Sequence, residues 1–151
     1  MVARTISLGD ITAEIDTANG GRIASLRVAT TSLLVTHAES LLDWGLYPMA
    51  PYAGRVRDAQ LHLDAQMFPL RTNAAPHSIH GTVCDRPWKV DAHDATSILM
   101  STDTGPDWPF AATVTHHIAV TEASVRCELT ITAHDTMPAQ LGWHPWFAQP
   151  R

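Results

Sequence analysis

Two histidines of this chain stand among neighbours that point to proton transfer. His80 lies near the end of residues 73–81, a segment with Pro and Gly, and His144 lies among aromatic residues in the segment 141–147. Gly and Pro are typical of turns, and aromatic neighbours are typical of an apolar cleft. Because the pKa of a free imidazole lies near neutrality, the two rings predict an acid–base site.

A pair of arginines in the middle of the chain suggests how such a site could bind a ligand. Residues 47–58 are rich in proline and aromatic side chains and carry Arg55 and Arg57, which would point the same way on an extended segment. A guanidinium donates to hydroxyl oxygens while aromatic rings stack on the C–H face of a sugar, so Arg55 suits a polyol. Alternatively, both arginines lie on a surface strand and pair with Asp58 and Asp64. The spacing alone leaves both interpretations open.

The remaining histidines fit less specific roles. An ordinary polar position in a β-protein is enough to explain His37, His62, His93, His116, His117 and His134. His77 is interpreted as a neighbour that shapes the segment around His80. A metal site of His77, His80 and a remote third ligand is possible in principle. However, this His-x-x-His pair lies in an extended Gly- and Pro-containing context without a nearby acidic or Cys ligand, so we do not expect a metal. We expect no cofactor either.

The elements that must position these residues are strands, because apolar residues recur with a period of two. Residues 11–16 alternate between apolar and polar, and residues 9–10 before them suit a two-residue hairpin turn. In residues 22–28 one face of the strand is expected to carry Ala24, Leu26 and Val28.

The clearest pair of strands lies near the end of the chain. Alternate residues of 114–120 share one face, alternate residues of 125–131 share another, and 121–123 form the turn. No long window shows an amphipathic helix, and the eight Gly and ten Pro recur at the spacing of sandwich or barrel turns. The sequence therefore predicts an all-β antiparallel β-sandwich, with residues 1–151 forming one domain or part of one.

Composition and charge bound the class of protein. The 151 residues include 45% hydrophobic and 17% charged residues, as expected for a soluble globular domain, and carry a formal charge of −5. The basic residues are scattered, which does not favour a nucleic-acid partner. Two cysteines are too few for a disulfide framework. No apolar leader or long apolar run occurs, so we expect a cytoplasmic protein without a membrane partner.

Five segments resemble, in the right order, the motifs of one known family. They are residues 19–26 (NGGRIASL), 51–64 (PYAGR, then LHLD), 73–81 (NAAPHSIHG), 107–134 (beginning DWPF) and 141–147 (LGWHPWF). Through them the chain resembles the N-terminal half of the aldose 1-epimerases, or galactose mutarotases. The resemblance implies that residues 1–151 form half of a galactose mutarotase-like supersandwich.

The reaction of that family explains why such residues would be needed. Interconverting the α and β anomers of a hexose such as galactose or glucose requires deprotonation of the anomeric hydroxyl and protonation of the ring oxygen. The resemblance implies that His144 protonates the ring oxygen and that His80 holds or polarises it. It further implies that Arg55, His77 and Trp146 contact the sugar.

Two residues near these positions depart from the family's pattern. Gly54 stands where the family usually has Asn, which removes one polar contact or loop brace. Trp146 replaces the usual Tyr, which keeps a stacking face without the hydroxyl. Trp143 and Trp146 flank His144 in the sequence, and both are expected to limit the access of water to it.

The second half of the family's sequence is the largest departure. Family members are longer, and their second half supplies a glutamate base and an aspartate that binds hydroxyls. We therefore expect the chain alone to be hardly more active than free imidazole. Half of a sandwich would also expose strand edges and an apolar face, which predicts self-association or binding of a C-terminal half-protein. The alternatives are a non-catalytic carbohydrate-binding module and an inactive remnant.

Overall fold

The computed structural model describes residues 3–149, and in that range the chain forms β-strands and no α-helix. In chain order the elements are β1 (Ala3–Leu8), β2 (Ile11–Asp16), β3 (Arg22–Val28), β4 (Thr31–Ser32), β5 (Leu46–Met49), β6 (Arg55–Val56), the 3-10 turn η1 (Arg57–Ala59), β7 (Gln60–Leu63), β8 (Gln66–Pro69), β9 (Ser78–Ile79), β10 (Lys89–His93), β11 (Ser97–Asp103), β12 (Ala112–Val120), β13 (Val125–Ala133) and β14 (Gly142–Pro145). The predicted all-β fold is confirmed. Across residues 3–149 there is no helix with the length and apolarity to span a membrane.

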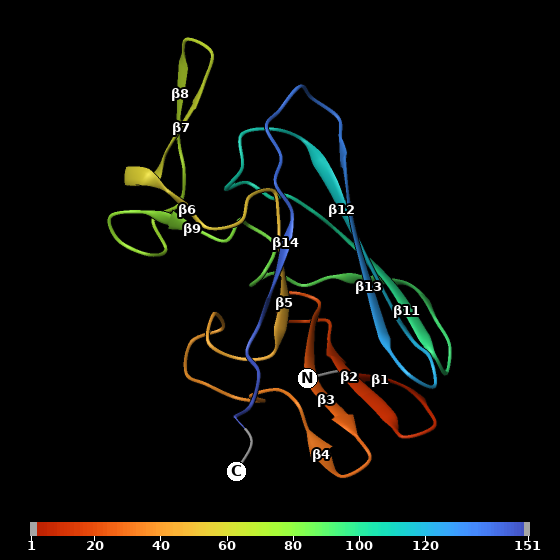
Figure 1. The fold of residues 1–151 in the computed structure, drawn as a ribbon. Helices are drawn as coiled ribbons and strands as arrows, with labels where there is room; N and C mark the ends of the chain where they lie inside the picture. The colour runs from red at the N-terminus through yellow and green to blue at the C-terminus, as the bar shows by residue number, and fades with distance from the viewer. Residues whose placement is uncertain (1–2, 150–151) are drawn as a thin grey trace.

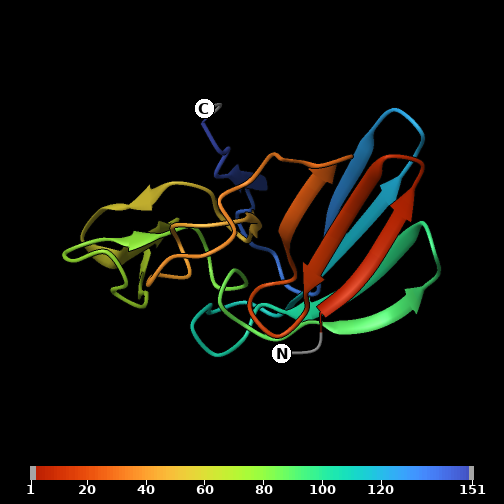
Figure 2. The same cartoon turned by 90° about the horizontal axis from the view of Figure 1, so that it is seen from below.

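Two antiparallel sheets face each other across one apolar core (Figure 1, Figure 2). The first sheet has the order β1-β2-β3-β5-β14, with β4 added to β3, and the second has the order β10-β11-β12-β13. Ile6 and Ile15 from the first sheet meet Ile98 and Ile118 from the second in the core. Two small two-stranded units, β6-β9 and β7-β8, lie to one side of this sandwich (Figure 1).

The period of two in the sequence is the alternation of buried and exposed side chains. Along β12 every second residue from Ala112 to Val120 is buried, and the residues between them are partly exposed. Ile11, Ala13 and Ile15 repeat this pattern along β2. Full burial of one Val or Ile side chain contributes roughly 1.5–3 kcal/mol to folding, which selects the face that turns inward. Both predicted hairpins, β1-β2 and β12-β13, form.

The predicted face of β3 is correct at Leu26 and wrong at Ala24, because the strand contains a β-bulge. Leu26 packs against the core as expected. The register with β2 shifts between Glu14 and Ile15, which leaves Ala24 without a partner residue. A bulge adds one residue and reverses the alternation beyond it. Ile23 is therefore the residue that is fully buried at this point of the strand.

The inner face of β13 is covered less completely than that of β12. Its apolar residues contact the core but stay partly exposed, namely Val125, Cys127, Leu129 and Ile131. The outer edge of this nine-residue strand pairs with no other strand in the described part of the chain. An unpaired edge beside an apolar face is a surface with which other strands readily pair. The sandwich is open on this side.

Candidate active site

Side chains that are far apart in the sequence converge on a cavity of about 340 Å³ between β5, β6, β9 and β14. Its lining consists of Leu42, Asp43, Tyr47, Arg55, Ala74, Ile79, His80, His144 and Trp146. The structure thus brings together Arg55, His80, His144 and Trp146, all of which the sequence singled out. We call this the histidine cavity.

The pairing of β14 with β5 sets the position of His144. In this antiparallel pair His144 lies opposite Tyr47, and the two rings stack with centroids 5.1 Å apart and planes at 8°. Trp146 lies two residues further along, on the same side of the chain, and stacks on His144 at 5.4 Å. The Nδ1 atom of His144 is buried and makes no hydrogen bond within residues 3–149. No protein group in the described residues therefore competes for this nitrogen.

His80 follows β9, and its ring meets that of His144 edge-on with centroids 5.1 Å apart. The His80 backbone N–H donates to Gly54 O at 2.9 Å, and the Gly54 N–H donates back to Nδ1 of the ring at 3.2 Å. Because Nδ1 accepts this bond, the proton of the neutral ring is on Nε2. Desolvation lowers the pKa of His80, and the nearby charges of His144 and Arg55 lower it further, so the ring is neutral at pH 7.

Two glycines allow the backbone to follow this path around His80. Gly54 has φ +77°, a left-handed conformation that Gly adopts freely and Asn adopts more readily than most residues. Glycine at this position therefore allows the turn without strain. Gly81 lies against Ala50 so closely that a Cβ atom would clash with the Ala50 carbonyl oxygen. A larger residue at 81 would displace the segment that carries His80.

Trp143 points away from the histidine cavity, so the expectation that it shields His144 is wrong. Successive residues of a strand face opposite sides, and Trp143 Nε1 donates to His116 Nε2 at 3.2 Å. The Nδ1 atom of His116 in turn donates to Gly21 O at 3.1 Å. Burial lowers the pKa of His116 to about 4. His116 is thus a neutral, fully bonded histidine, as the sequence analysis expected for a polar residue of a β-protein.

The loop of residues 41–44 forms one wall of the histidine cavity and is held by side chains from distant segments. The fully buried guanidinium of Arg22 donates to the carbonyl oxygens at both ends of the loop, at 2.6 and 3.0 Å. Tyr47 Oη and Trp146 Nε1 both donate to Leu42 O, at 3.0 and 2.8 Å. These bonds connect the loop to β3, β5 and the segment after β14.

Asp43 and Arg55 are the charged residues of the lining. Neither side chain makes a hydrogen bond or an ion pair within residues 3–149. The alternative in which Arg55 pairs with Asp58 or Asp64 is therefore not the arrangement in the structure. The sequence analysis missed Asp43 and Arg22. The arginine that opens the largely apolar β3 segment was the available signal for Arg22, whereas no periodicity or motif marks Asp43.

His77 lies outside the lining of the histidine cavity. Ala74 and His77 exchange two backbone hydrogen bonds in a tight turn, and His77 Nδ1 accepts the backbone N–H of Asp58 at 3.0 Å. His77 therefore ties the turn η1 to the segment before β9. Within residues 3–149 no group of three or more His, Cys, Asp or Glu side chains is arranged to hold a metal ion.

The chain has recognisable relatives. The sequence model described as Aldose 1-epimerase matches residues 5–150. The chain belongs to the aldose 1-epimerase family. The uncharacterized protein YphB of Escherichia coli (strain K12) is 24% identical over 152 residues, which is 97% of this chain and 52% of YphB. The chain therefore spans about half the length of this relative.

Solved structures show the galactose mutarotase-like fold. A candidate aldose 1-epimerase of Escherichia coli K12 superimposes with a TM-score of 0.87 at 24% identity, covering 97% of this chain and 52% of that protein. A galactose mutarotase-like protein of Lactobacillus casei gives a TM-score of 0.83 at 22% identity, with coverage of 97% and 50%. At this identity the likeness establishes the fold of this aldose 1-epimerase family member.

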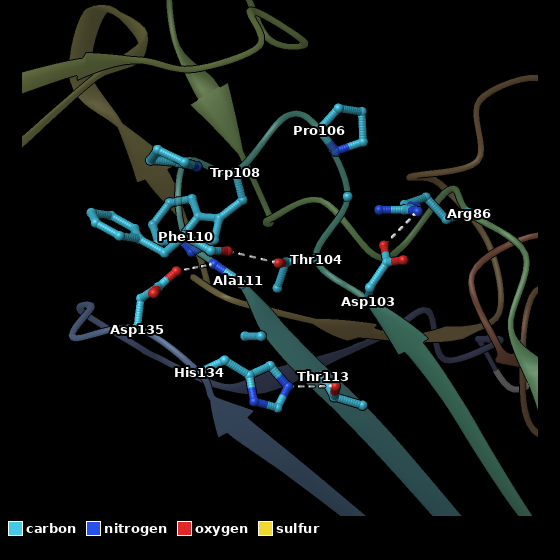
Figure 3. A pocket seen from close by; sticks show the side chains of 13 residues that line it. Arg86, Asp103, Thr104, Pro106, Trp108, Phe110, Ala111, Thr113, His134 and Asp135 are labelled. Atoms are coloured by element: carbon cyan, nitrogen blue, oxygen red, sulfur yellow. Dashed lines mark hydrogen bonds and ion pairs between the residues drawn. The ribbon is translucent and has the colours of Figure 1, made fainter.

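A larger cavity of about 620 Å³ lies beside the loop of residues 104–111, at the start of β12 and the end of β13 (Figure 3). We call it the loop cavity. Its polar groups are mostly bonded to their neighbours. Arg86 pairs with Asp103 at 2.7 Å, Asp135 accepts a backbone N–H of the loop at 2.8 Å, and His134 bonds a threonine of β12 at 2.9 Å. The Asp135 contact holds the loop on the second sheet.

Two buried donors of the loop cavity stay unbonded within the described range, Arg86 Nη1 and Trp108 Nε1. A guanidinium does not lose its proton in proteins, and an indole N–H is a donor only. Neither group can act as an acid or a base near neutral pH. The histidine cavity contains the unbonded imidazole nitrogen of His144, so the smaller cavity is the better candidate for the family's chemistry.

Proposed function

We propose that the histidine cavity is one side of an aldose 1-epimerase site, in which the α and β anomers of a hexose such as galactose or glucose interconvert. The observation that carries this proposal is the combination of two imidazoles in one cavity. His80 is a neutral ring with its proton on Nε2, and His144 has an unbonded Nδ1. Membership of the family supports the assignment.

In the proposed mechanism, protonated His144 gives its proton to the ring oxygen O5 of the sugar. A base removes the proton of the anomeric hydroxyl at the same stage, and the C1–O5 bond breaks with its electron pair on O5. C1 becomes the carbonyl carbon of the open-chain aldehyde. Rotation about C1–C2 presents the other face of the aldehyde, and the reverse proton transfers close the ring. Each positioned proton-transfer group contributes roughly 10²–10⁴-fold to the rate.

The other residues of the cavity bind and orient. His80 can donate only from Nε2, because its Nδ1 is bonded to Gly54, and a hydrogen bond from Nε2 would hold the ring oxygen. The unpaired guanidinium of Arg55 donates to sugar hydroxyls. Trp146 keeps the His144 ring in place by stacking and offers an apolar face to the sugar.

We propose that a second half of the fold supplies the base, because the chain spans about half the length of its relative. The unpaired edge and partly exposed inner face of β13 are the surface that this half would cover. Without it, the same edge favours pairing between copies of the chain. Sedimentation of the purified chain should show association, and a compact monomer that unfolds cooperatively would contradict this.

Polarimetry on freshly dissolved α-galactose tests the function. The chain alone should be hardly faster than free imidazole, and addition of the second half of a relative such as YphB should restore catalysis. Failure of every complemented preparation to speed mutarotation would contradict the proposal. Strong catalysis by the chain alone would place the base within residues 1–151.

A carbohydrate-binding module without catalysis is the second candidate. It is favoured because Arg55, Trp146 and both imidazoles lie in this half of the fold. Saturable hexose binding without catalysis in the complemented protein would support it. The cytoplasmic location expected from the sequence stays a prediction.

A further inference from the structure

The loop of residues 41–44 contains neither helix nor strand, yet long-range bonds hold its backbone. Arg22 reaches it from β3, Tyr47 from β5 and Trp146 from the segment after β14. Surface loops are normally more mobile than the elements that they connect. Bonds of this kind remove that freedom before a ligand arrives, which is how pre-organised binding sites reduce the cost of association.

Asp43 is the charged side chain that this loop presents to the histidine cavity. Its carboxylate makes no hydrogen bond or ion pair within residues 3–149, although its backbone is fixed on both sides. An ionised carboxylate is an acceptor only. Hydroxyl hydrogens of a ligand are therefore groups that it can bind in this cavity.

We propose that Asp43 contacts the sugar directly, accepts a hydrogen bond from one of its hydroxyls and makes the site selective for neutral hexoses over hexose phosphates. This inference rests on the proposed function, because it takes the histidine cavity as the sugar site. Apart from Tyr47 and the two histidines, Asp43 and Arg55 are the ionisable groups of the lining, and their formal charges cancel. A neutral polyol matches both, since its hydroxyls donate to the carboxylate and accept from the guanidinium.

A sugar phosphate meets a different environment in this cavity. Arg55 is the one permanent cation of the lining that its phosphate would meet, and the Asp43 carboxylate would face it as a like charge. Sites that recognise phosphate use several arginines or backbone N–H groups at once. The lining offers one guanidinium and one opposing carboxylate, so the neutral sugar is the favoured ligand.

The indole N–H signals of two tryptophans make the inference testable by nuclear magnetic resonance. Trp146 Nε1 is bonded to Leu42 O, next to Asp43, whereas Trp143 Nε1 is bonded to His116 on the opposite face of β14. Titration with galactose should shift the Trp146 signal in a saturable way and leave the Trp143 signal unchanged. Galactose 6-phosphate should need about tenfold higher concentration, which corresponds to the loss of one charge-assisted hydrogen bond.

Asp43→Asn separates the role of the carboxylate from that of the loop. This variant should raise the dissociation constant for galactose about tenfold and reduce the discrimination against galactose 6-phosphate. Asp10→Asn, which removes the same charge from the exposed β1-β2 turn, should change neither value.

Three outcomes would overturn the inference: unchanged galactose affinity in Asp43→Asn, wild-type affinity for the phosphate that equals that for galactose, or no saturable shift of Trp146. The polarimetry result is independent of this titration. Catalysis by the complemented protein with normal hexose affinity in Asp43→Asn would remove the role of Asp43 and leave the proposed function intact.

Discussion

The loop cavity is larger than the histidine cavity, at about 620 against 340 Å³, and it also carries arginine, aspartate and histidine. The two differ in what those groups are bonded to. In the loop cavity Arg86, His134 and Asp135 bind neighbouring residues, and the Asp135 bond fixes the loop of residues 104–111. In the histidine cavity Arg22 and aromatic side chains hold the wall formed by residues 41–44. Within the described residues, His144 Nδ1 is left unbonded.

This difference shows that volume is a poor guide to function in a small β-sandwich. A titratable group bonded to its own protein is already used by the fold, whereas a held but unbonded group is available to a ligand. His144 illustrates the second case, because Tyr47 and Trp146 fix the ring by stacking while Nδ1 stays unbonded in residues 3–149.

Replacing Arg22, which holds the wall of the histidine cavity, and Arg86, which lines the loop cavity, should give the largest difference in the free energy of unfolding. Arg22→Met would leave carbonyl oxygens without donors, including the buried ones of Trp44 and Cys84, and should lower the free energy of unfolding by roughly 3–5 kcal/mol. Arg86→Met removes a partly exposed ion pair with Asp103 and should cost less than about 1 kcal/mol. Urea denaturation measures the free energy of unfolding of both variants. Equal losses would contradict the claim that Arg22 is needed by the fold more than Arg86 is.

The buried, hydrogen-bonded imidazole of His116 should make the stability of the protein depend on pH in the acid range. The pKa of folded His116 is lowered to about 4, so between roughly pH 6.5 and 4 the unfolded chain binds a proton that the folded chain does not. Stability should therefore fall as the pH is lowered through this window, by on the order of 3 kcal/mol for this group. The same urea series in His116→Gln isolates the effect, and an identical pH dependence in both proteins would argue against it.

The unbonded imidazole should instead control the rate. In the complemented protein, His144→Ala is expected to lower kcat/KM for mutarotation by about 10²-fold or more. His134→Ala, in the loop cavity, should leave the rate unchanged, because its ring is bonded to the second sheet. Polarimetry compares the two variants. A normal rate in His144→Ala would show that the free nitrogen is not the acid.

Substitution of Trp143 in β14 or of Trp146 just after it should have the smallest effects, and the two variants should differ in hexose affinity. Trp143→Phe removes one hydrogen bond to His116 and should cost about 1 kcal/mol of stability without changing hexose affinity. Trp146→Phe removes the bond to Leu42 O beside Asp43 and should weaken hexose binding as well. Thermal unfolding measures the stability of both variants, and the galactose titration measures their affinity. A changed affinity in Trp143→Phe would contradict the assignment of Trp143 to stability alone.

Local patterns in the sequence determined the strands and much of the candidate site. Alternation along 11–16 and 114–120 predicted β2 and β12, because a strand that covers a core must turn every second residue inward. The alternation also predicted both hairpins. The family's motifs singled out His80 and His144, and the structure places the two rings 5.1 Å apart.

Strand register and long-range bonds decided the side-chain orientations that the sequence did not predict. A bulge in β3 placed Ile23 rather than Ala24 in the core, and pairing with β5 turned Trp143 away from His144. The bulge has no local signal, because alternation shows that two faces exist but not where the register shifts. The direction of Trp143 follows from alternation once residues 142–145 are known to form a strand.

Asp43 depended on tertiary structure most of all. Its loop has no periodicity or motif, and Arg22 and Trp146 hold it from positions far away in the sequence. His77 shows the reverse, since its motif placed it beside His80 while its ring bonds the turn η1 outside the cavity. The sequence could identify which residues are capable of the chemistry. Only the folded chain determines which of them share a cavity, because contacts between distant segments set both the walls and the bonds that leave a group free.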